Sequence, residues 1–269
     1  MNIGYIGLGR MGFNMVLRLI EKGHSIVATD TNSETVDKAT AEGAVGVSSA
    51  AEVVKRLEAP RVVWIMVPHQ FVDDVLEEIT PLLRDDDIVI DGGNSPYKES
   101  MRRAQTLKSV GVNYIDAGVS GGPEGAREGA CVMIGGEKTV YEKVEGLFKD
   151  IAAPNAYKYL GASGAGHFVK MIHNGIEYGM MQAIAEGFSV MQKSDFDLDL
   201  TKVADLYNHR SVVESRLVGW LHDAYKEFGG HAAVRDKNTE DLEIAFLIQQ
   251  HQRKLVVTLG DRQIYCRMY

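Results

Sequence analysis

The chain has 269 residues, which is enough for one large domain or two ordinary ones. Hydrophobic residues make up 45% of the sequence and charged residues 25%, a balance that is typical of globular proteins and excludes disorder as the dominant state. The net charge of −8 and the lack of a dense Lys/Arg run argue against nucleic acid as a partner.

Cysteine usage and hydropathy indicate the compartment. The two cysteines, Cys131 and Cys266, lie far apart and form neither a metal-spaced pair nor a disulfide framework, which favours a reducing compartment. No run approaches the roughly 18 apolar residues that span a bilayer, and the N-terminus has no apolar core of the signal-peptide type. We therefore expect a cytoplasmic protein without a membrane partner.

The sequence opens on a strand, a glycine turn and a helix. An apolar run at residues 3–6 leads into GLGRMG, after which apolar side chains recur at helical spacing. In this context a GxGxxG match predicts a dinucleotide-binding loop, although such a motif alone also occurs in ordinary surface turns. Gly7 permits the tight turn, Gly9 lets the backbone approach a pyrophosphate, and Gly12 allows close packing of helix on strand. The helix N-terminus adds unpaired N–H groups and a positive dipole end.

A second predicted strand, HSIVATD at residues 24–30, ends on Asp30. This is close to the distance of about 20 residues at which an acid binds the adenosine ribose. A carboxylate there accepts hydrogen bonds from a free 2′-OH and repels a 2′-phosphate, and no arginine follows it in Thr31, Asn32 or Ser33. The sequence therefore favours NAD over NADP.

Further strand segments alternate with helical stretches. The strands are VVWIMV (62–67), DIVID (87–91), NYID (113–116) and CVMIG (131–135), and the helices include 70–83 and 97–110. This alternation predicts an α/β fold with a Rossmann-type, doubly wound and mainly parallel sheet that helices cover on both faces.

Three loops follow the carboxyl ends of these strands, where such sheets bind ligands. They are residues 67–69, 92–95 and 120–123. Each alone is also typical of an ordinary loop without a function. Their joint position favours function: Asn94 can bond a nicotinamide ribose or a substrate, and the amides of residues 120–122 can form an oxygen-binding nest. We expect the following residues to contact the cofactor: Gly7, Leu8, Gly9, Arg10, Met11, Gly12, Asp30, Thr31, Val67, Pro68 and Asn94.

Small residues at 161–166 (GASGAG) precede helical spacing that runs to about Lys193. Polar side chains fall within an arc of roughly 140° on this helix, and apolar side chains cluster opposite them. A solvated face is the commoner explanation for such an arc, but it is usually built from repeated Glu and Lys. Here the arc holds one potential base and one potential acid with three other polar groups, so we predict a buried helix whose polar side faces a cleft. The polar residues are Lys170, His173, Asn174, Glu177 and Tyr178; the apolar ones are Val169, Ile172, Ile176 and Met180.

Four segments resemble the decarboxylating 6-phosphogluconate dehydrogenases, in particular their shorter NAD-type branch. They are GLGRMG (7–12), IVIDGGNSPY (88–97), GVSGGPEGAREG (118–129) and GAGHFVKMIHNGIEYG (164–179). The resemblance covers about the first 210 residues. Related 3-hydroxyacid dehydrogenases share the glycine loop and a helix lysine but lack DGGNS and KMIHNGIEYG.

The resemblance implies a role for each matching residue. Lys170 resembles the general base that removes the C3 hydroxyl proton as hydride leaves C3, and Glu177 resembles the acid that protonates the enediol left by loss of carbon dioxide. One base, one acid and no metal satisfy this chemistry, and the lysine must be neutral to act. The residues that match the substrate site, for a phosphorylated sugar acid, are Asn94, Ser120, Gly121, Gly122, His173, Asn174 and, for the phosphate, Tyr178.

The later part of the chain departs from the family pattern. Where the family carries a phosphate-binding arginine, this chain has Glu214, and Arg216 is the nearby candidate for that role. FGGHAAV, from Phe228, resembles the family's C-terminal tail but arrives early, and the sequence after it has no counterpart. A genuine short variant, a truncated or rearranged gene and a reading-frame change all remain open.

These observations predict three parts: a dinucleotide-binding domain at 1–162, a partial helical substrate and dimerisation domain at 163–230, and an atypical tail at 231–269. The leading function is NAD-dependent oxidative decarboxylation of 6-phosphogluconate by a homo-oligomer, a dimer or tetramer. A 3-hydroxyacid dehydrogenase that does not decarboxylate and a nucleotide-binding remnant without turnover are the alternatives. In the tail, KLVVTLG is expected to be a short strand and EDLEIAFLIQQHQRK an amphipathic helix.

Overall fold

The computed structural model describes residues 1–228, 255–259 and 262–266. The chain forms two compact units, Met1–Ile172 and His173–Tyr269. The three-part division at 162 and 230 stays a prediction. The helix expected at residues 240–254 lies outside the described residues.

The first unit contains an eight-stranded sheet in the order β3-β2-β1-β4-β5-β6-β7-β8. Strands β1 to β6 run parallel to one another, β7 is antiparallel to β6, and β8 is parallel to β7. This sheet confirms the predicted Rossmann-type, mainly parallel architecture. The strands are β1 (Asn2–Ile6), β2 (Ser25–Thr29), β3 (Val45–Gly46), β4 (Val62–Ile65), β5 (Ile88–Asp91), β6 (Asn113–Ser120), β7 (Ala130–Gly136) and β8 (Ala152–Gly161).

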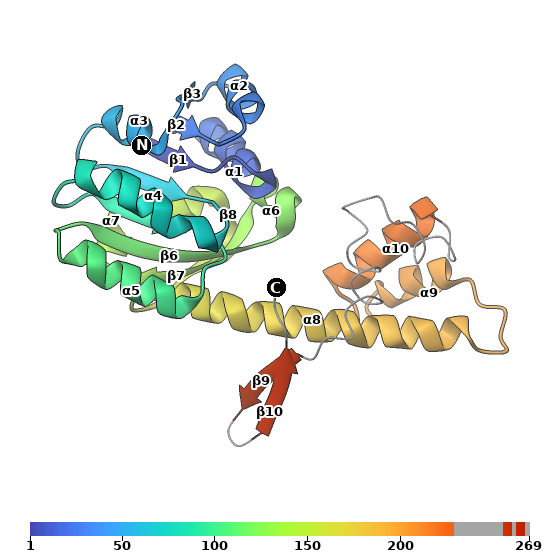
Figure 1. Cartoon of the computed structure of the whole chain (residues 1–269). Helices are drawn as coiled ribbons and strands as arrows, with labels where there is room; N and C mark the ends of the chain where they lie inside the picture. The colour runs from blue at the N-terminus through green and yellow to red at the C-terminus, as the bar shows by residue number, and fades with distance from the viewer. Residues whose placement is uncertain (229–254, 260–261, 267–269) are drawn as a thin grey trace. The chain divides into compact units, whose positions relative to one another are not determined.

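Helices cover both faces of this sheet (Figure 1). They are α1 (Arg10–Glu21), α2 (Ser33–Ala41), α3 (Ala50–Lys55), α4 (Val72–Ile79), α5 (Tyr97–Lys108), α6 (Gly122–Glu128) and α7 (Lys138–Ile151), with short 3-10 turns η1 (His69–Phe71) and η2 (Thr80–Leu82). In place of the predicted helix at 70–83 there is one α-helix between two 3-10 turns. The α-helix ends at Ile79 because Pro81 has no N–H to continue the α-helical bonding.

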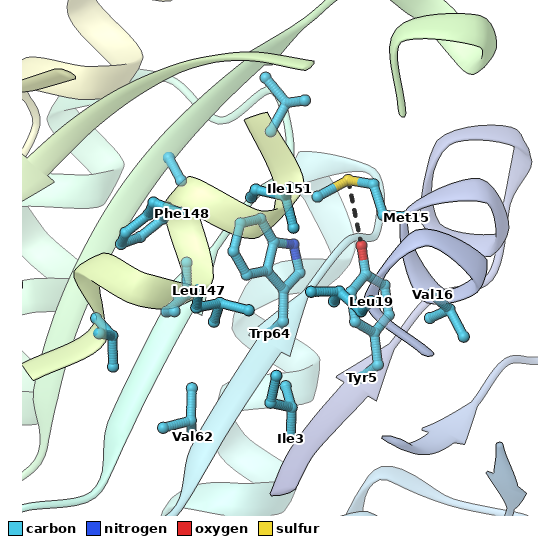
Figure 2. Packing of buried hydrophobic residues seen from close by; sticks show 14 of the residues in the cluster. Ile3, Tyr5, Met15, Val16, Leu19, Val62, Trp64, Leu147, Phe148 and Ile151 are labelled. Atoms are coloured by element: carbon cyan, nitrogen blue, oxygen red, sulfur yellow. Dashed lines mark hydrogen bonds between the residues drawn. The ribbon is translucent and has the colours of Figure 1, made fainter. Parts of the chain in front are cut away.

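Successive side chains of the central strands point to opposite faces of the sheet, and they form two apolar cores, one on each face. Trp64 of β4 packs with α1 and α7 on one side, whereas its neighbours Val63 and Ile65 pack with α3 and α4 on the other. Figure 2 shows Trp64 between Tyr5 of β1 and Phe148 of α7, with the Tyr5 hydroxyl donating to the Met15 sulfur at 3.4 Å. Both faces of β4 are buried and every residue in it is apolar, which is typical of a central strand in a parallel sheet.

The second unit contains most of α8 (Ala165–Gln192), which begins in the first unit, together with α9 (Leu200–Tyr207) and α10 (Arg216–Phe228). Phe188 of α8, Ala204 of α9 and Leu221 of α10 belong to one small apolar core. The Asp199 carboxylate caps α9 by accepting the N–H groups of Thr201 and Lys202. A further antiparallel pair joins β9 (Leu255–Leu259) to β10 (Arg262–Cys266), so KLVVTLG does contain a strand.

Candidate active site

The glycine loop between β1 and α1 has the geometry that a dinucleotide phosphate needs. Gly7 has a φ of 101°, and its N–H donates to the Thr29 carbonyl at 2.9 Å, which turns the chain sharply after β1. A Cβ at Gly12 would lie 2.1 Å from the Gly7 carbonyl oxygen, so only glycine lets α1 pack this close. A Cβ at Gly9 would meet nothing within 4 Å, which leaves the backbone open to a phosphate at the start of α1.

Asp30 follows β2 and joins two loops. One carboxylate oxygen accepts the Leu8 N–H at 2.6 Å, and the other accepts the Asn32 N–H at 2.8 Å. The acid predicted for ribose recognition therefore also fixes the glycine loop, and the two roles are compatible because each oxygen accepts more than one hydrogen bond. Sequence spacing predicted the acid but could not show which backbone N–H faces it. Thr31 is exposed beside it, and of the other loop residues Leu8 is buried while Arg10 is exposed.

The loops after β4 and β5 lie directly against each other. A Cβ at Gly93 would lie 2.8 Å from the Val67 carbonyl oxygen, and one at Gly92 would lie 2.3 Å from Nε1 of Trp64. Both glycines of the GGNS segment are thus required by close packing. Pro68 and Asn94 are exposed at the two loops, so their side chains can meet a ligand.

The third predicted loop begins where β6 ends, at Ser120. Gly121 and Gly122 have φ values of 124° and 63°, and the Gly121 carbonyl accepts the Gly125 N–H at 2.9 Å as α6 begins. Two successive positive φ angles are strained for any residue with a side chain, which explains the paired glycines. Strand β6 is four residues longer than the predicted segment, and this extension carries the chain to Ser120.

Lys170 lies in the first unit, on the opening turns of α8. The buried Asp116 carboxylate of β6 accepts the Gly164 N–H at 2.6 Å and the His167 N–H at 2.9 Å, and so caps this helix. A Cβ at Gly118 would lie 2.4 Å from the Lys170 Cβ, so the lysine stem packs on the strand backbone. Lys170 is 9% exposed. The strand and helix are fixed against each other at the predicted base.

A second bond anchors the same helix. His167 Nδ1 and the Ser100 hydroxyl of α5 lie 2.7 Å apart, and both side chains are buried. This contact joins α8 to α5, the helix that follows the Asn94 loop. Sequence reasoning gave neither residue a role, because a histidine and a serine 67 positions apart carry no local signal of contact.

The remaining predicted polar residues belong to the second unit. His173 Nδ1 lies 3.2 Å from the Asn174 side-chain oxygen and 3.6 Å from a carboxylate oxygen of Glu177, and all three side chains are half-buried. Tyr178 is exposed. Arg216 begins α10, and its guanidinium lies 5.4 Å from the ring centre of Trp220, a cation–π contact.

The prediction that α8 is a buried helix is wrong for this single chain. Ile176 is 60% exposed and Met180 43% exposed, whereas Lys170 on the polar arc is buried. The helical period correctly separated polar from apolar side chains, but it does not say which side is covered.

The described residues contain neither a candidate metal site nor a candidate membrane span. Among them, no three His, Cys, Asp or Glu side chains gather in a way that could hold a metal ion. Within the same part of the chain, no helix combines the length and apolar character needed to cross a bilayer.

Comparisons with known proteins match both units. Residues 2–161 match the family model of the NAD-binding domain of 6-phosphogluconate dehydrogenase, and residues 166–209 match that enzyme's C-terminal domain. A Bacillus subtilis relative that bears the family's name is 51% identical over 84% of this chain and 76% of its own length. The NAD(+)-dependent, decarboxylating 6-phosphogluconate dehydrogenase of Haloferax volcanii is 42% identical over 85% of this chain and 76% of its own length.

A solved structure agrees with the sequence relatives. The Plasmodium falciparum 6-phosphogluconate dehydrogenase, whose title names NADP+ as cofactor and 6-phosphogluconate as substrate, superposes with a TM-score of 0.74 at 33% identity. The match covers 91% of this chain and 54% of that one, so this chain spans about half the length of that enzyme.

Proposed function

Because this chain belongs to the 6-phosphogluconate dehydrogenase family, we propose that it oxidises and decarboxylates 6-phosphogluconate with NAD to give ribulose 5-phosphate and carbon dioxide. The observation that carries the proposal is the placement of Lys170. This buried amine stands on a helix that Asp116 caps, and its stem packs on Gly118, two residues before the Ser120 loop.

The first unit fits a dinucleotide. The open backbone at Gly9 would take the pyrophosphate, and the Asp30 carboxylate would take the adenosine ribose hydroxyls. Val67, Pro68 and Asn94 would line the nicotinamide end. When bound, NAD supplies a hydride acceptor for C3 of the substrate.

The chain's own residues would handle two protons. Lys170, in its neutral form, would remove the C3 hydroxyl proton as the C3–H bond breaks, which leaves a 3-keto acid. The C1–C2 bond of that acid then breaks, carbon dioxide departs, and the electron pair is held as an enediolate because the C3 carbonyl oxygen accepts the negative charge. Glu177 would deliver a proton to C1 of the product, and no metal is required for either transfer.

The other polar residues would position the sugar acid. Ser120, Gly121 and Gly122 would bind its oxygens at the end of β6, together with Asn94. On the later turns of α8, His173 and Asn174 would bind the substrate, and Tyr178 would bind its phosphate. Arg216 would add a cation for the phosphate, in place of the family arginine where this chain has Glu214.

A homo-oligomer, a dimer or tetramer, belongs to the same proposal. The exposed apolar side chains of Val169, Ile176 and Met180 support it, because large apolar side chains grouped on one helix are commonly covered by a partner. Light scattering coupled to size exclusion measures the mass directly, and a monomer at working concentration would contradict this part.

The deciding experiment assays purified, mass-verified protein with 6-phosphogluconate and either NAD or NADP, and follows NADH and carbon dioxide together. Equal amounts of the two products support the proposal. NADH without carbon dioxide would identify a plain 3-hydroxyacid dehydrogenase, and NAD binding without turnover would identify a nucleotide-binding remnant. Lys170→Met keeps the stem that packs on Gly118 but removes the base, so turnover should fall by about 10²–10⁴. Lys149→Met on the exposed side of α7 is the matched control and should leave it unchanged.

The cofactor preference has its own test. Asp30→Asn removes the negative charge but retains one acceptor oxygen for the Leu8 N–H. Since a hydrogen bond to a charged group exceeds a neutral one by about 1–1.5 kcal/mol, the ratio of kcat/KM for NAD over NADP should fall about tenfold. Asp37→Asn, on the exposed side of α2, should leave the ratio unchanged. An unchanged ratio in Asp30→Asn would refute the assignment of Asp30.

A further inference from the structure

Arg103 of α5 lies at the centre of a buried polar cluster that joins two of the candidate loops. Its Nη1 donates to the Asp91 carboxylate at 3.3 Å and to the Ser95 hydroxyl at 3.1 Å, both beside the loop after β5. Its Nη2 donates to the His69 carbonyl at 3.2 Å, in the loop after β4. Nε and Nη2 also bond the two Asp73 oxygens at 2.9 and 3.1 Å, at the start of α4. The side chain is 2% exposed.

Asp91 closes the loop after β5 onto the end of its own strand. Its carboxylate accepts the Gly93 N–H at 3.1 Å, the Ser95 hydroxyl at 2.8 Å and the Tyr114 hydroxyl at 2.9 Å. Burial and the negative charge of Asp91 raise the pKa of Tyr114 well above its usual value, so the phenol stays a donor. Asn94 lies between Gly93 and Ser95, and both of these neighbours are bonded to Asp91. The chain is therefore anchored on either side of the exposed Asn94, through the backbone N–H of Gly93 and the side chain of Ser95.

Stability alone does not account for this cluster. Removing two charges from water is unfavourable, and a buried ion pair often contributes no more stability than apolar residues of the same volume. What the guanidinium adds is geometry, since its planar fork reaches several acceptors in fixed directions. Here those acceptors lie on two different loops and on α4.

We propose that Arg103 is a positioning residue that fixes the loops after β4 and β5 relative to each other. It thereby sets the position of Val67 and Pro68 on one loop relative to Asn94 on the other. This inference rests on the proposed function for the roles of those three residues. Arg103 itself is buried, so its proposed role is to position the loops and not to contact cofactor or substrate. Its effect on catalysis is transmitted through the backbone of Gly93 and the carbonyl of His69.

The neighbouring Arg102 provides a matched control. It binds the same Asp73 carboxylate at 2.7 Å and also binds Glu99, but it is half exposed and bonds neither loop. A lysine at either position keeps the positive charge and can still reach one carboxylate. Only at position 103 does the change remove a guanidinium group that bonds both loops.

The test compares Arg103→Lys with Arg102→Lys in the full chain. It measures thermal unfolding, the dissociation constant of NADH by calorimetry, and kcat and KM for 6-phosphogluconate. We expect Arg103→Lys to fold, to weaken NADH binding at least threefold and to lower kcat/KM at least tenfold, while Arg102→Lys stays within twofold of the parent in each. Ser95→Ala removes the hydroxyl that accepts from Arg103 and donates to Asp91, and it leaves Arg103 in place, so it should raise KM and weaken NADH binding with a smaller loss of thermal stability.

The outcomes separate this inference from the proposed function. If the parent protein binds NADH but does not convert 6-phosphogluconate, the proposed function fails, and the NADH constants still decide the role of Arg103. If Arg103→Lys folds with the parent's NADH affinity, the positioning role is overturned. If Arg103→Lys does not fold, Ser95→Ala decides: parental KM and NADH affinity in that variant would overturn the inference.

Discussion

Replacing Asp116 by asparagine tests whether this buried carboxylate anchors the helix that carries Lys170. The carboxylate accepts two backbone N–H groups, from Gly164 and His167, and asparagine offers one oxygen and one NH₂ group. One of the two N–H groups would then face a donor in a buried site. Losing a hydrogen bond to a charged group costs about 1.5–3 kcal/mol, and losing the negative charge at a buried helix N-terminus adds up to about 2 kcal/mol. We therefore expect Asp116→Asn to lower the free energy of unfolding of the first unit by about 3 kcal/mol.

The assay can isolate that unit because the chain has two tryptophans, Trp64 in the first unit and Trp220 in the second. In a Trp220→Phe background, urea unfolding followed by fluorescence reports on the buried Trp64 alone. For a unit of this size, about 3 kcal/mol corresponds to a Tm lower by about 6–12 °C. Asp199→Asn is a comparison, since Asp199 also accepts two N–H groups at the start of a helix, but through one oxygen, at the surface and in the second unit, so it should leave the Trp64 transition unchanged. A loss below about 0.5 kcal/mol in Asp116→Asn, the range of ordinary surface changes, would refute the anchoring role.

Three further results are expected. Gly9→Ala should fold normally, since the new Cβ meets nothing, yet weaken NAD binding in calorimetry; Gly12→Ala should fold poorly, since its Cβ meets the Gly7 carbonyl, and equal stability of the two would contradict the loop geometry. Gly118→Ala should lower kcat more than it raises KM, because its Cβ would displace the Lys170 stem, and unchanged kinetics would contradict that contact. Hydrogen bonds to Arg103 and Arg102 lower the pKa of Asp73 from 3.8 to about 2, so its stabilisation is complete above pH 4 and is lost as pH falls towards 2. Since Asp73 is nearly half exposed, that contribution is at most about 1 kcal/mol. In urea titrations, the free energy of unfolding of Asp73→Asn should therefore fall less between pH 4 and pH 2 than that of the parent protein.

The sheet could be predicted from the sequence because its central strands are apolar on both faces. Runs such as VVWIMV are bounded by turn residues and spaced by helical stretches, and this pattern is typical of a parallel sheet. Two strands of this eight-stranded sheet were missed. Strand β8, AAPNAYKYLG, lies at the sheet edge with most of its residues partly exposed, and it contains proline and asparagine, which are rare in strands. Strand β3 has two residues, too few for any period.

Residues of the candidate site could be proposed from the sequence only where the signal is local. Gly7, Gly9, Gly12 and Asp30 follow one another within 24 positions, so spacing was enough to assign them a cofactor role. The groups that hold the site are not local in this sense. Asp116 bonds residues 48 and 51 positions away, and such partners are set by the fold and not by a motif.

Asp91 and Asp116, to which sequence reasoning assigned no role, occupy equivalent positions in the sheet. They are register partners on the adjacent parallel strands β5 and β6, and both are fully buried. A buried carboxylate is tolerated when hydrogen bonds replace its lost water, and here backbone N–H groups of an irregular segment help to do so: Gly93 for Asp91, and Gly164 with His167 for Asp116.

The loop that carries Asn94 and the helix that carries Lys170 are therefore each tied to the sheet at the same register step. An acceptor of this kind fixes direction as well as position, because a hydrogen bond weakens steeply when it bends. Changes at Asp91 or Asp116 should for this reason reduce turnover further than their effect on the free energy of unfolding alone would require. The sheet would stay folded, but the Asn94 loop and the Lys170 helix would no longer be held in fixed positions on it. Turnover that falls only in proportion to the folded fraction would show that these carboxylates stabilise the unit without positioning anything.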